Sequence, residues 1–263
     1  MKEVSIIGTV GVPANYGGFE SLVENIIGYN SLDDIHYTVY CSAKGYPHRQ
    51  SVYKNADLKY VPLDANGSQS ILYDIISLIK ATKKSDVVLI LGVSGCCFLP
   101  IYRLFSKKRL IINIDGLEHR REKWGKYAKA FLKFSEKMAV KHADVVVADN
   151  KGIQDYVKKE YRTETELIAY GGDHVLCDIT DVEEEILEKY GLKNISYSFS
   201  LCRIEPENNV HVILEAFKAS GKKLFFVGNW NRSPYGKSLL EKYAKYGNIH
   251  LLSPIYDVKT LNV

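Results

Sequence analysis

The chain has 263 residues, of which 46% are hydrophobic and 25% are charged, and its formal net charge is +4. These fractions are those of an ordinary globular protein, and the length predicts two domains or one large one. The small positive excess does not indicate a nucleic-acid-binding protein, because such domains usually carry a dense basic face.

Neither the N-terminus nor the apolar stretches contain the pattern of an export signal or a membrane span. The longest apolar stretch, residues 87–101, is interrupted by glycines and is shorter than the ~20 residues that cross a bilayer. The chain has five cysteines, an odd number, and they lack the spacing of a zinc site. This pattern is typical of cysteines that stay reduced as free thiols. The sequence therefore predicts a cytoplasmic protein.

In the first 170 residues, short runs rich in Val and Ile alternate with longer helical patterns. The predicted strands are Val4–Ile7, His36–Cys41, Leu58–Val61, Val87–Leu91, Leu110–Ile114, Val145–Ala148 and Glu166–Ala169. Apolar residues at helical spacing lie between most of them. Strands that are apolar at nearly every position are expected in a parallel sheet covered on both faces, so we predict a complete Rossmann-like α/β domain over residues 1–172.

A second βα series follows the break at Tyr170-Gly171-Gly172-Asp173. Its predicted strands are Tyr197–Cys202, Lys223–Val227 and Ile249–Leu252, with helices near Asn208–Ala219 and Tyr235–Tyr246. Three strands are few for a doubly wound domain, whose common size is ~100–150 residues. Residues 173–263 are therefore predicted to form an incomplete second Rossmann-like domain.

The loop between the first strand and the first helix is rich in glycine. Its candidate ligand-binding residues are Gly11, Asn15, Tyr16, Gly17 and Gly18. Bare backbone at the start of a helix lets a phosphate or sugar approach the free N–H groups. The spacing is not GxGxxG, so a nicotinamide or flavin site is disfavoured, and a flexible loop without a ligand is the alternative.

Three separated segments of the chain resemble one family. They are GVPANYGGFESLVENI at residues 11–26, the stretch from Asn113 to Asn150, and SLCRIEPENNVHVILEAF at residues 200–217. In this order they resemble a bacterial subfamily of the family 4 glycosyltransferases, the capsule and cell-wall rhamnosyltransferase-like proteins.

This resemblance implies a GT-B architecture and transfer of a sugar, such as rhamnose, in the synthesis of bacterial surface polysaccharide. The implied donor is a dTDP- or UDP-sugar, which is a substrate, and the implied acceptor is a glycan or a lipid-linked glycan. No resident cofactor and no metal ion are implied. The N-terminal domain would hold the acceptor and the C-terminal domain the donor.

Two groups of residues are candidates for the chemistry. Asp115, Glu118 and His119 follow a predicted strand and are candidate catalytic residues, because each can orient a hydroxyl or move a proton. The alternative for Asp115, the first choice, is a turn-forming or capping role.

The second group is expected to bind the donor phosphates. Arg203 follows a strand end, and the related motif uses its arginine on the diphosphate; Asn208 and Asn209 replace the usual lysine before the next helix. A surface ion pair with Glu205 or Glu207 is the alternative for Arg203.

Lysines recur every three or four residues along one predicted helix: Lys123, Lys126, Lys129, Lys133, Lys137 and Lys141. They fall within a ~120° arc, and Trp124, Tyr127, Phe131 and Met138 are predicted on the opposite side. Such a stripe favours peripheral contact with an anionic membrane through Lys123, Lys126, Lys129 and Lys133. A solvated helix face is the alternative.

Family 4 enzymes carry a glycine-rich loop and a pair of glutamates that grip the donor, and no such pattern follows Asp257. From this departure we expect a truncated chain, which leaves its activity open. A non-catalytic module that binds a glycan or a partner protein is one alternative function. A sugar-nucleotide epimerase is another, and the three ordered motifs argue against it.

Overall fold

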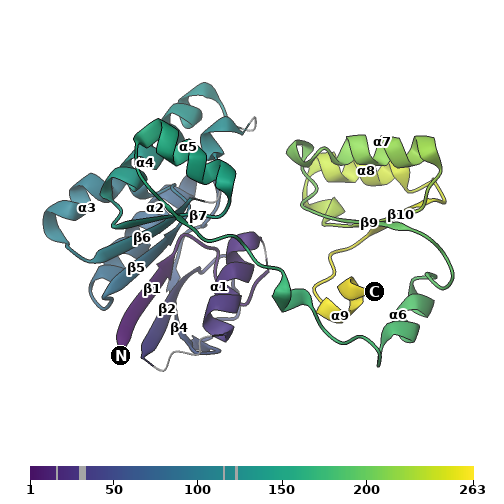
Figure 1. Cartoon of the computed structure of the whole chain (residues 1–263), viewed down its shortest axis with the longest axis horizontal. Helices are drawn as coiled ribbons and strands as arrows, with labels where there is room; N and C mark the ends of the chain where they lie inside the picture. Colours follow the sequence, from purple (N-terminus) through teal and green to yellow (C-terminus); the bar gives the residue numbers. More distant parts are fainter. Residues whose placement is uncertain (16, 30–33, 115, 122–123) are drawn as a thin grey trace. The chain divides into compact units, whose positions relative to one another are not determined.

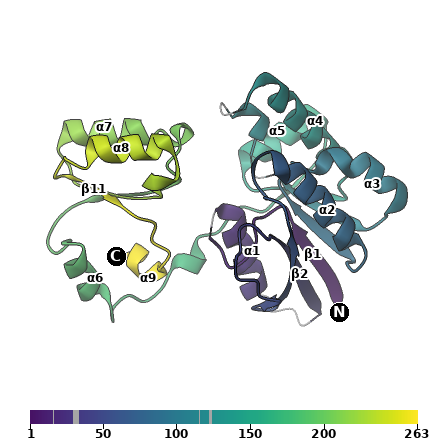
Figure 2. The same cartoon turned by 180° about the vertical axis from the view of Figure 1, so that it is seen from behind.

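The computed structural model describes residues 1–15, 17–29, 34–114, 116–121 and 124–263. The chain divides into two compact units, Met1–Tyr170 and Gly171–Val263 (Figures 1 and 2).

The first unit is built on an eight-stranded sheet of order β3-β4-β2-β1-β5-β6-β7-β8. Its strands are β1 (Lys2–Ile7), β2 (Ile35–Ser42), β3 (Val52–Tyr53), β4 (Ala56–Val61), β5 (Val87–Leu91), β6 (Arg109–Ile114), β7 (Val145–Ala148) and β8 (Glu166–Leu167). All neighbours pair in parallel except β3 and β4. The seven predicted strands are confirmed; the two-residue β3 is too short to produce a sequence pattern.

Five α-helices lie beside this sheet: α1 (Gly18–Gly28), α2 (Ser70–Thr82), α3 (Leu99–Phe105), α4 (Lys126–His142) and α5 (Lys151–Tyr161). Successive strand residues point to opposite faces, so the sheet carries two apolar clusters. One contains Ile6 and packs against α1, and the other contains Ile7 and packs against α2, α3, α4 and α5. The sheet is therefore covered on both faces, as its apolar strands require.

The second unit has a parallel three-stranded sheet of order β11-β10-β9. Its elements are α6 (Glu183–Lys189), β9 (Ser198–Leu201), α7 (Val210–Ser220), β10 (Leu224–Val227), α8 (Pro234–Tyr243), β11 (Ile249–Leu252) and α9 (Val258–Asn262). The three predicted strands and the two helices between them are confirmed. Helices α7 and α8 cover one face of the sheet, where Leu214, Phe226 and Leu239 form the core (Figure 1).

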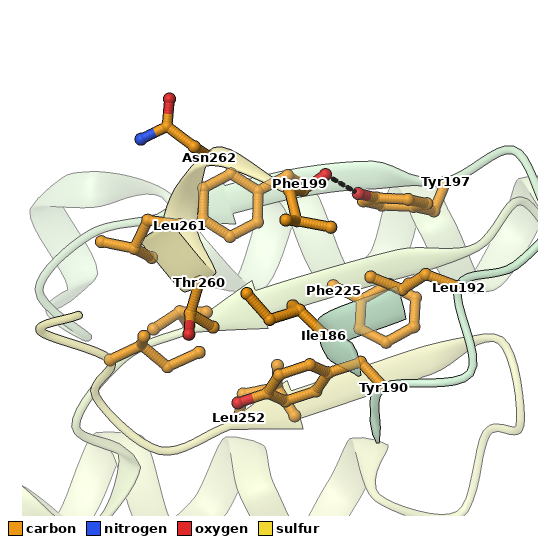
Figure 3. A pocket seen from close by; sticks show the side chains of 13 residues that line it. Ile186, Tyr190, Leu192, Tyr197, Phe199, Phe225, Leu252, Thr260, Leu261 and Asn262 are labelled. Atoms are coloured by element: carbon orange, nitrogen blue, oxygen red, sulfur yellow. Dashed lines mark hydrogen bonds between the residues drawn. The ribbon is translucent and has the colours of Figure 1, made fainter. Parts of the chain in front are cut away.

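The opposite face of the second sheet borders an apolar cavity of about 130 Å³. Figure 3 shows Phe199 and Phe225 of the sheet with Ile186 of α6 and Leu261 of α9 around it. The Tyr197 hydroxyl donates to the carbonyl oxygen of Val263 at 2.6 Å, which ties the end of the chain to this cavity.

Helix α4 differs from the predicted basic stripe. The Lys133 ammonium is 2.9 Å from Glu160 and 3.5 Å from the buried carboxylate of Glu136, so Lys133 belongs to an inward network. The side chain of Tyr127, predicted on the side opposite the lysines, is 90% exposed and faces solvent. The helix buries a narrow row that does not include Tyr127 and consists of Leu132, Ser135, Glu136, Ala139 and Val140. Lys123 lies outside the described residues.

Candidate functional site

The candidate site of the first unit lies where the strand order reverses. Strands β1 and β5 are neighbours, but the helices that follow them, α1 and α3, lie on opposite faces of the sheet. Ligands of open α/β sheets bind at the carboxyl ends of such a pair of strands. Gly8 ends β1 with φ +87°, and a Cβ there would lie 2.1 Å from the carbonyl oxygen of Leu91. The two strand ends therefore meet backbone to backbone, and only glycine fits at position 8.

The loop after β1 is fixed by a buried carboxylate from α1. Glu20 is 3% exposed, and its Oε1 accepts hydrogen bonds from the Thr9 hydroxyl and the Val10 N–H, both at 2.7 Å. The hydroxyl of Tyr73, a residue of α2, donates a hydrogen bond to the Thr9 carbonyl oxygen at 2.9 Å. A glutamate at the start of a helix also interacts favourably with the helix dipole.

A second glutamate of α1 holds the next part of the loop. Glu24 accepts from the Ala14 N–H and the Tyr53 hydroxyl, both at 2.6 Å, and pairs with Lys54 at 3.2 Å. Burial raises the pKa of Glu24, but these hydrogen bonds and the ammonium outweigh it, so the pKa lies below its ordinary value. The carboxylate form is therefore favoured in the folded state.

The glycines of the loop serve different purposes. Gly11 has φ +133°, and a Cβ there would lie 2.7 Å from the Cys41 side chain, so packing alone requires this glycine. Gly17 caps α1 without a side-chain hydrogen bond, and a Cβ at Gly18 would meet no atom within 4 Å. Backbone is thus open at the helix start, next to the exposed Asn15. Tyr16 lies outside the described residues.

The loop after β6 contains the predicted catalytic residues. Asp115 lies outside the described residues. Glu118 Oε1 accepts from Arg121 at 2.6 Å and Oε2 from the Trp124 indole at 3.2 Å, so both of its oxygens are used within the loop. His119 is mostly buried and points its Nδ1 at Glu136 of α4, 3.1 Å away.

Glu136 organises a buried polar cluster around His119. Its side chain is 1% exposed, and Oε1 accepts from the hydroxyls of Tyr156 at 2.6 Å and Tyr161 at 2.5 Å. Lys133 hydrogen-bonds Tyr156 as well. A carboxylate only accepts hydrogen bonds, so the bond to His119 requires a proton on Nδ1 and leaves the lone pair of the neutral ring on Nε2. This arrangement orients a histidine as a proton acceptor.

In the second unit, the predicted phosphate-binding residues lie at the carboxyl end of β9. Arg203 is exposed two residues after the strand. Asn208 donates from its side-chain amide to the Arg203 carbonyl at 2.7 Å, which closes the loop. Asn209 precedes α7 with φ +53°, a left-handed conformation that asparagine tolerates. The Tyr235 hydroxyl accepts from the His211 N–H in the first turn of α7, at 3.2 Å.

Sequence reasoning missed the roles of Glu20 and Glu136, although both carry the same signal. Each is a charged residue on the buried face of an amphipathic helix. Glu20 shares that face with Val23 and Ile27, and Glu136 shares it with Leu132 and Ala139. A charge on an apolar face is costly unless it is paired, so such a position indicates a hydrogen-bonded cluster.

The described residues contain no group of three His, Cys, Asp or Glu side chains placed to hold a metal ion. None of their helices combines the length and apolar character needed to cross a membrane.

A sequence profile of the family described as "Domain of unknown function (DUF1972)" matches residues 1–173. The chain belongs to the DUF1972 family. A search of curated proteins finds no match to it.

Solved structures resemble this DUF1972 protein over both units. Sucrose-phosphate synthase from Thermosynechococcus elongatus has a TM-score of 0.79 at 14% identity, over 99% of this chain and 72% of that one. HepE from Anabaena in complex with UDP-glucose has a TM-score of 0.71 at 12% identity, over 99% and 71%. UDP-GlcNAc 2-epimerase from Neisseria meningitidis has a TM-score of 0.57 at 16% identity, over 100% and 74%. The predicted α/β fold of the GT-B type is confirmed.

Proposed function

We propose that this protein is a metal-independent glycosyltransferase that moves a sugar from a UDP- or dTDP-sugar to a glycan. The observation that carries the proposal is His119, whose Nδ1 lies 3.1 Å from the buried Glu136 in the loop that follows β6 at the carboxyl edge of the sheet. The solved complexes of HepE with UDP and with UDP-glucose, proteins of the same fold, support a nucleotide-sugar donor. We keep rhamnose and a lipid-linked acceptor, in cytoplasmic synthesis of surface polysaccharide, as the finer form of the proposal.

In this proposal the acceptor lies at the carboxyl edge of the first sheet. His119 Nε2 takes the proton of an acceptor hydroxyl, and the oxygen bonds to the anomeric carbon of the donor sugar. Glu136 stabilises the imidazolium that forms, because it lies 3.1 Å from Nδ1. Asp115 remains a candidate for the same step, and the open backbone at Gly18 leaves room for a hydroxyl-rich ligand.

The donor diphosphate binds at the carboxyl end of β9. As the bond from the anomeric carbon to the phosphate oxygen breaks, both electrons stay on the nucleoside diphosphate. The Arg203 guanidinium and the positive end of the α7 helix dipole stabilise that negative charge. Asn208 and Asn209 act through the backbone of this loop, since Asn208 is bonded to the Arg203 carbonyl.

Release of nucleotide from a panel of UDP- and dTDP-sugars, with and without glycan acceptors, tests the proposal. Transfer predicts acceptor-dependent release and a glycosylated product by mass spectrometry. Glu136→Gln keeps the shape of the side chain but removes its charge, so we expect kcat to fall ~10²-fold with little change in KM. Glu164→Gln, on an exposed glutamate, is the control, and equal rates for both variants would refute the role of Glu136.

Epimerisation of a nucleotide sugar is a second candidate, because UDP-GlcNAc 2-epimerases share the fold over the whole chain. It predicts interconversion of the sugar without any acceptor. A binding module without catalysis predicts neither reaction, together with retention of the chain on a glycan array.

A further inference from the structure

Part of the amino edge of the first sheet, opposite the candidate site, carries a larger net positive charge than the whole chain. Three segments meet there: residues 79–86 at the end of α2, residues 101–109 from α3 into β6, and residues 137–144 at the end of α4. Together they hold nine lysines and arginines and two aspartates, although the whole chain has an excess of only four positive charges. The rest of the chain is therefore net negative, and this edge differs from it in sign.

Hydrogen bonds join these segments into one surface. Arg103 of α3 donates from Nε to the carbonyl of His142 at 3.0 Å and from Nη1 to the carbonyl of Lys108 at 2.9 Å. The hydroxyls of Thr82 and Tyr102 link α2 to α3 at 3.1 Å. Both views show α2 and α3 on the same side of the sheet (Figures 1 and 2).

Helix α3 presents an apolar face to the solvent in the middle of this surface. Leu99 and Tyr102 are buried, whereas Ile101, Leu104 and Phe105 are 54%, 85% and 58% exposed. These three residues have the i, i+3, i+4 spacing of one helical face. A contiguous exposed apolar group beside charged residues marks an interaction site.

The cations around α3 are available to a partner. Among the described residues, no ion pair joins an acidic side chain to any of six exposed lysines: Lys80, Lys83, Lys84, Lys107, Lys137 and Lys141. Of the two aspartates in the three segments, Asp144 is bound to Arg103 at 2.7 Å. The surface thus combines unpaired positive charge with protruding apolar side chains.

We propose that this amino-edge surface docks the protein on a bilayer that contains anionic lipids. Leu104 and Phe105 enter the boundary between headgroups and acyl chains, and the lysines contact the lipid phosphates. A nucleic acid would use the charge but not the protruding aliphatic side chains. Strands of six residues are ~20 Å long, so docking holds the carboxyl edge about that far above the membrane. Docking relies on these surface residues and does not depend on sugar transfer.

Co-sedimentation of the full chain with vesicles tests this proposal. We expect binding to mixed phosphatidylcholine and phosphatidylglycerol vesicles, loss of binding at high salt, and none to pure phosphatidylcholine. Leu104→Asp and the double variant Lys83→Glu with Lys107→Glu should each lower the partition coefficient at least ~10-fold, since each lysine near an anionic surface contributes several-fold. Both changes are on exposed side chains, and circular dichroism verifies that the variants fold.

Matched controls lie away from this surface. Tyr127→Ser removes an exposed aromatic residue at the start of α4, and Lys59→Glu reverses an exposed charge on β4. Both should bind vesicles like the wild type. The proposal is overturned if the wild-type chain does not bind anionic vesicles or if the controls lose binding as much as Leu104→Asp. A chain that shifts duplex DNA in a gel mobility assay but does not bind anionic vesicles would point to nucleic acid instead.

Discussion

Asp74 provides a quantitative test of how the first unit is packed. The carboxyl group is buried on the apolar side of α2, and its Oδ2 accepts one hydrogen bond, from the Gly95 N–H at 3.1 Å. Burial raises the pKa of Asp74 to about 8 from an ordinary 3.8, against the smaller opposing effect of the Gly95 N–H. Between these two values the folded protein keeps a proton that the unfolded chain has lost.

The free energy of unfolding should therefore fall as the pH rises through this interval. Each pH unit removes about 1.4 kcal/mol, and the whole interval ~6 kcal/mol. Asp74→Asn abolishes this dependence, because the amide Oδ1 still accepts from Gly95 and its N–H₂ replaces the protonated carboxyl group. Relative to wild type, the variant should gain ~4 kcal/mol in stability between pH 5 and pH 8.

Urea unfolding at several pH values, followed by circular dichroism, measures this difference directly. Asp155→Asn is the matched control, because the Asp155 side chain is 61% exposed and should give a constant difference over the same range. If the stabilities of Asp74→Asn and wild type run parallel from pH 5 to pH 8, the reasoning about Asp74 is refuted.

Two further predictions concern the loop after β1. Gly11→Ala places a side chain against Cys41 at a position with a left-handed backbone, so it should lower the free energy of unfolding by ~2 kcal/mol or more. Gly18→Ala, where a Cβ meets no atom, should lower it by less than ~1 kcal/mol. Equal losses in thermal or urea unfolding would contradict the different roles of these two glycines. Glu24→Gln should destabilise the protein at neutral pH and match wild type in strong acid, because a lowered pKa contributes stability above its ordinary value of 4.5 that is lost as the pH falls through the folded pKa. A Glu24→Gln difference that does not change between pH 3 and pH 7 would count against this role.

The strands and the position of the loops could be predicted from sequence, because a parallel sheet covered on both faces demands continuous apolar runs such as Val87–Leu91. The cluster around Glu136 could not, because Tyr156 and Tyr161 lie 20 and 25 residues further along the chain and only the packing of α5 against α4 brings them near. Tyr127 shows the converse limit. Its aromatic type favours burial, but its position on the helix surface places it in solvent.

The central claim is that the loop at Arg203 binds a nucleoside diphosphate, and a thermal-shift titration with UDP, dTDP, GDP and ADP tests it most directly. A ligand at 100 times its Kd stabilises the native state by about 2.7 kcal/mol, which is readily measured. We predict a selective shift with UDP or dTDP that Arg203→Ala abolishes and that Lys193→Ala, a change of an exposed lysine in the same unit, preserves. No shift with any of the four nucleotides, or an unchanged shift in Arg203→Ala, would contradict the account.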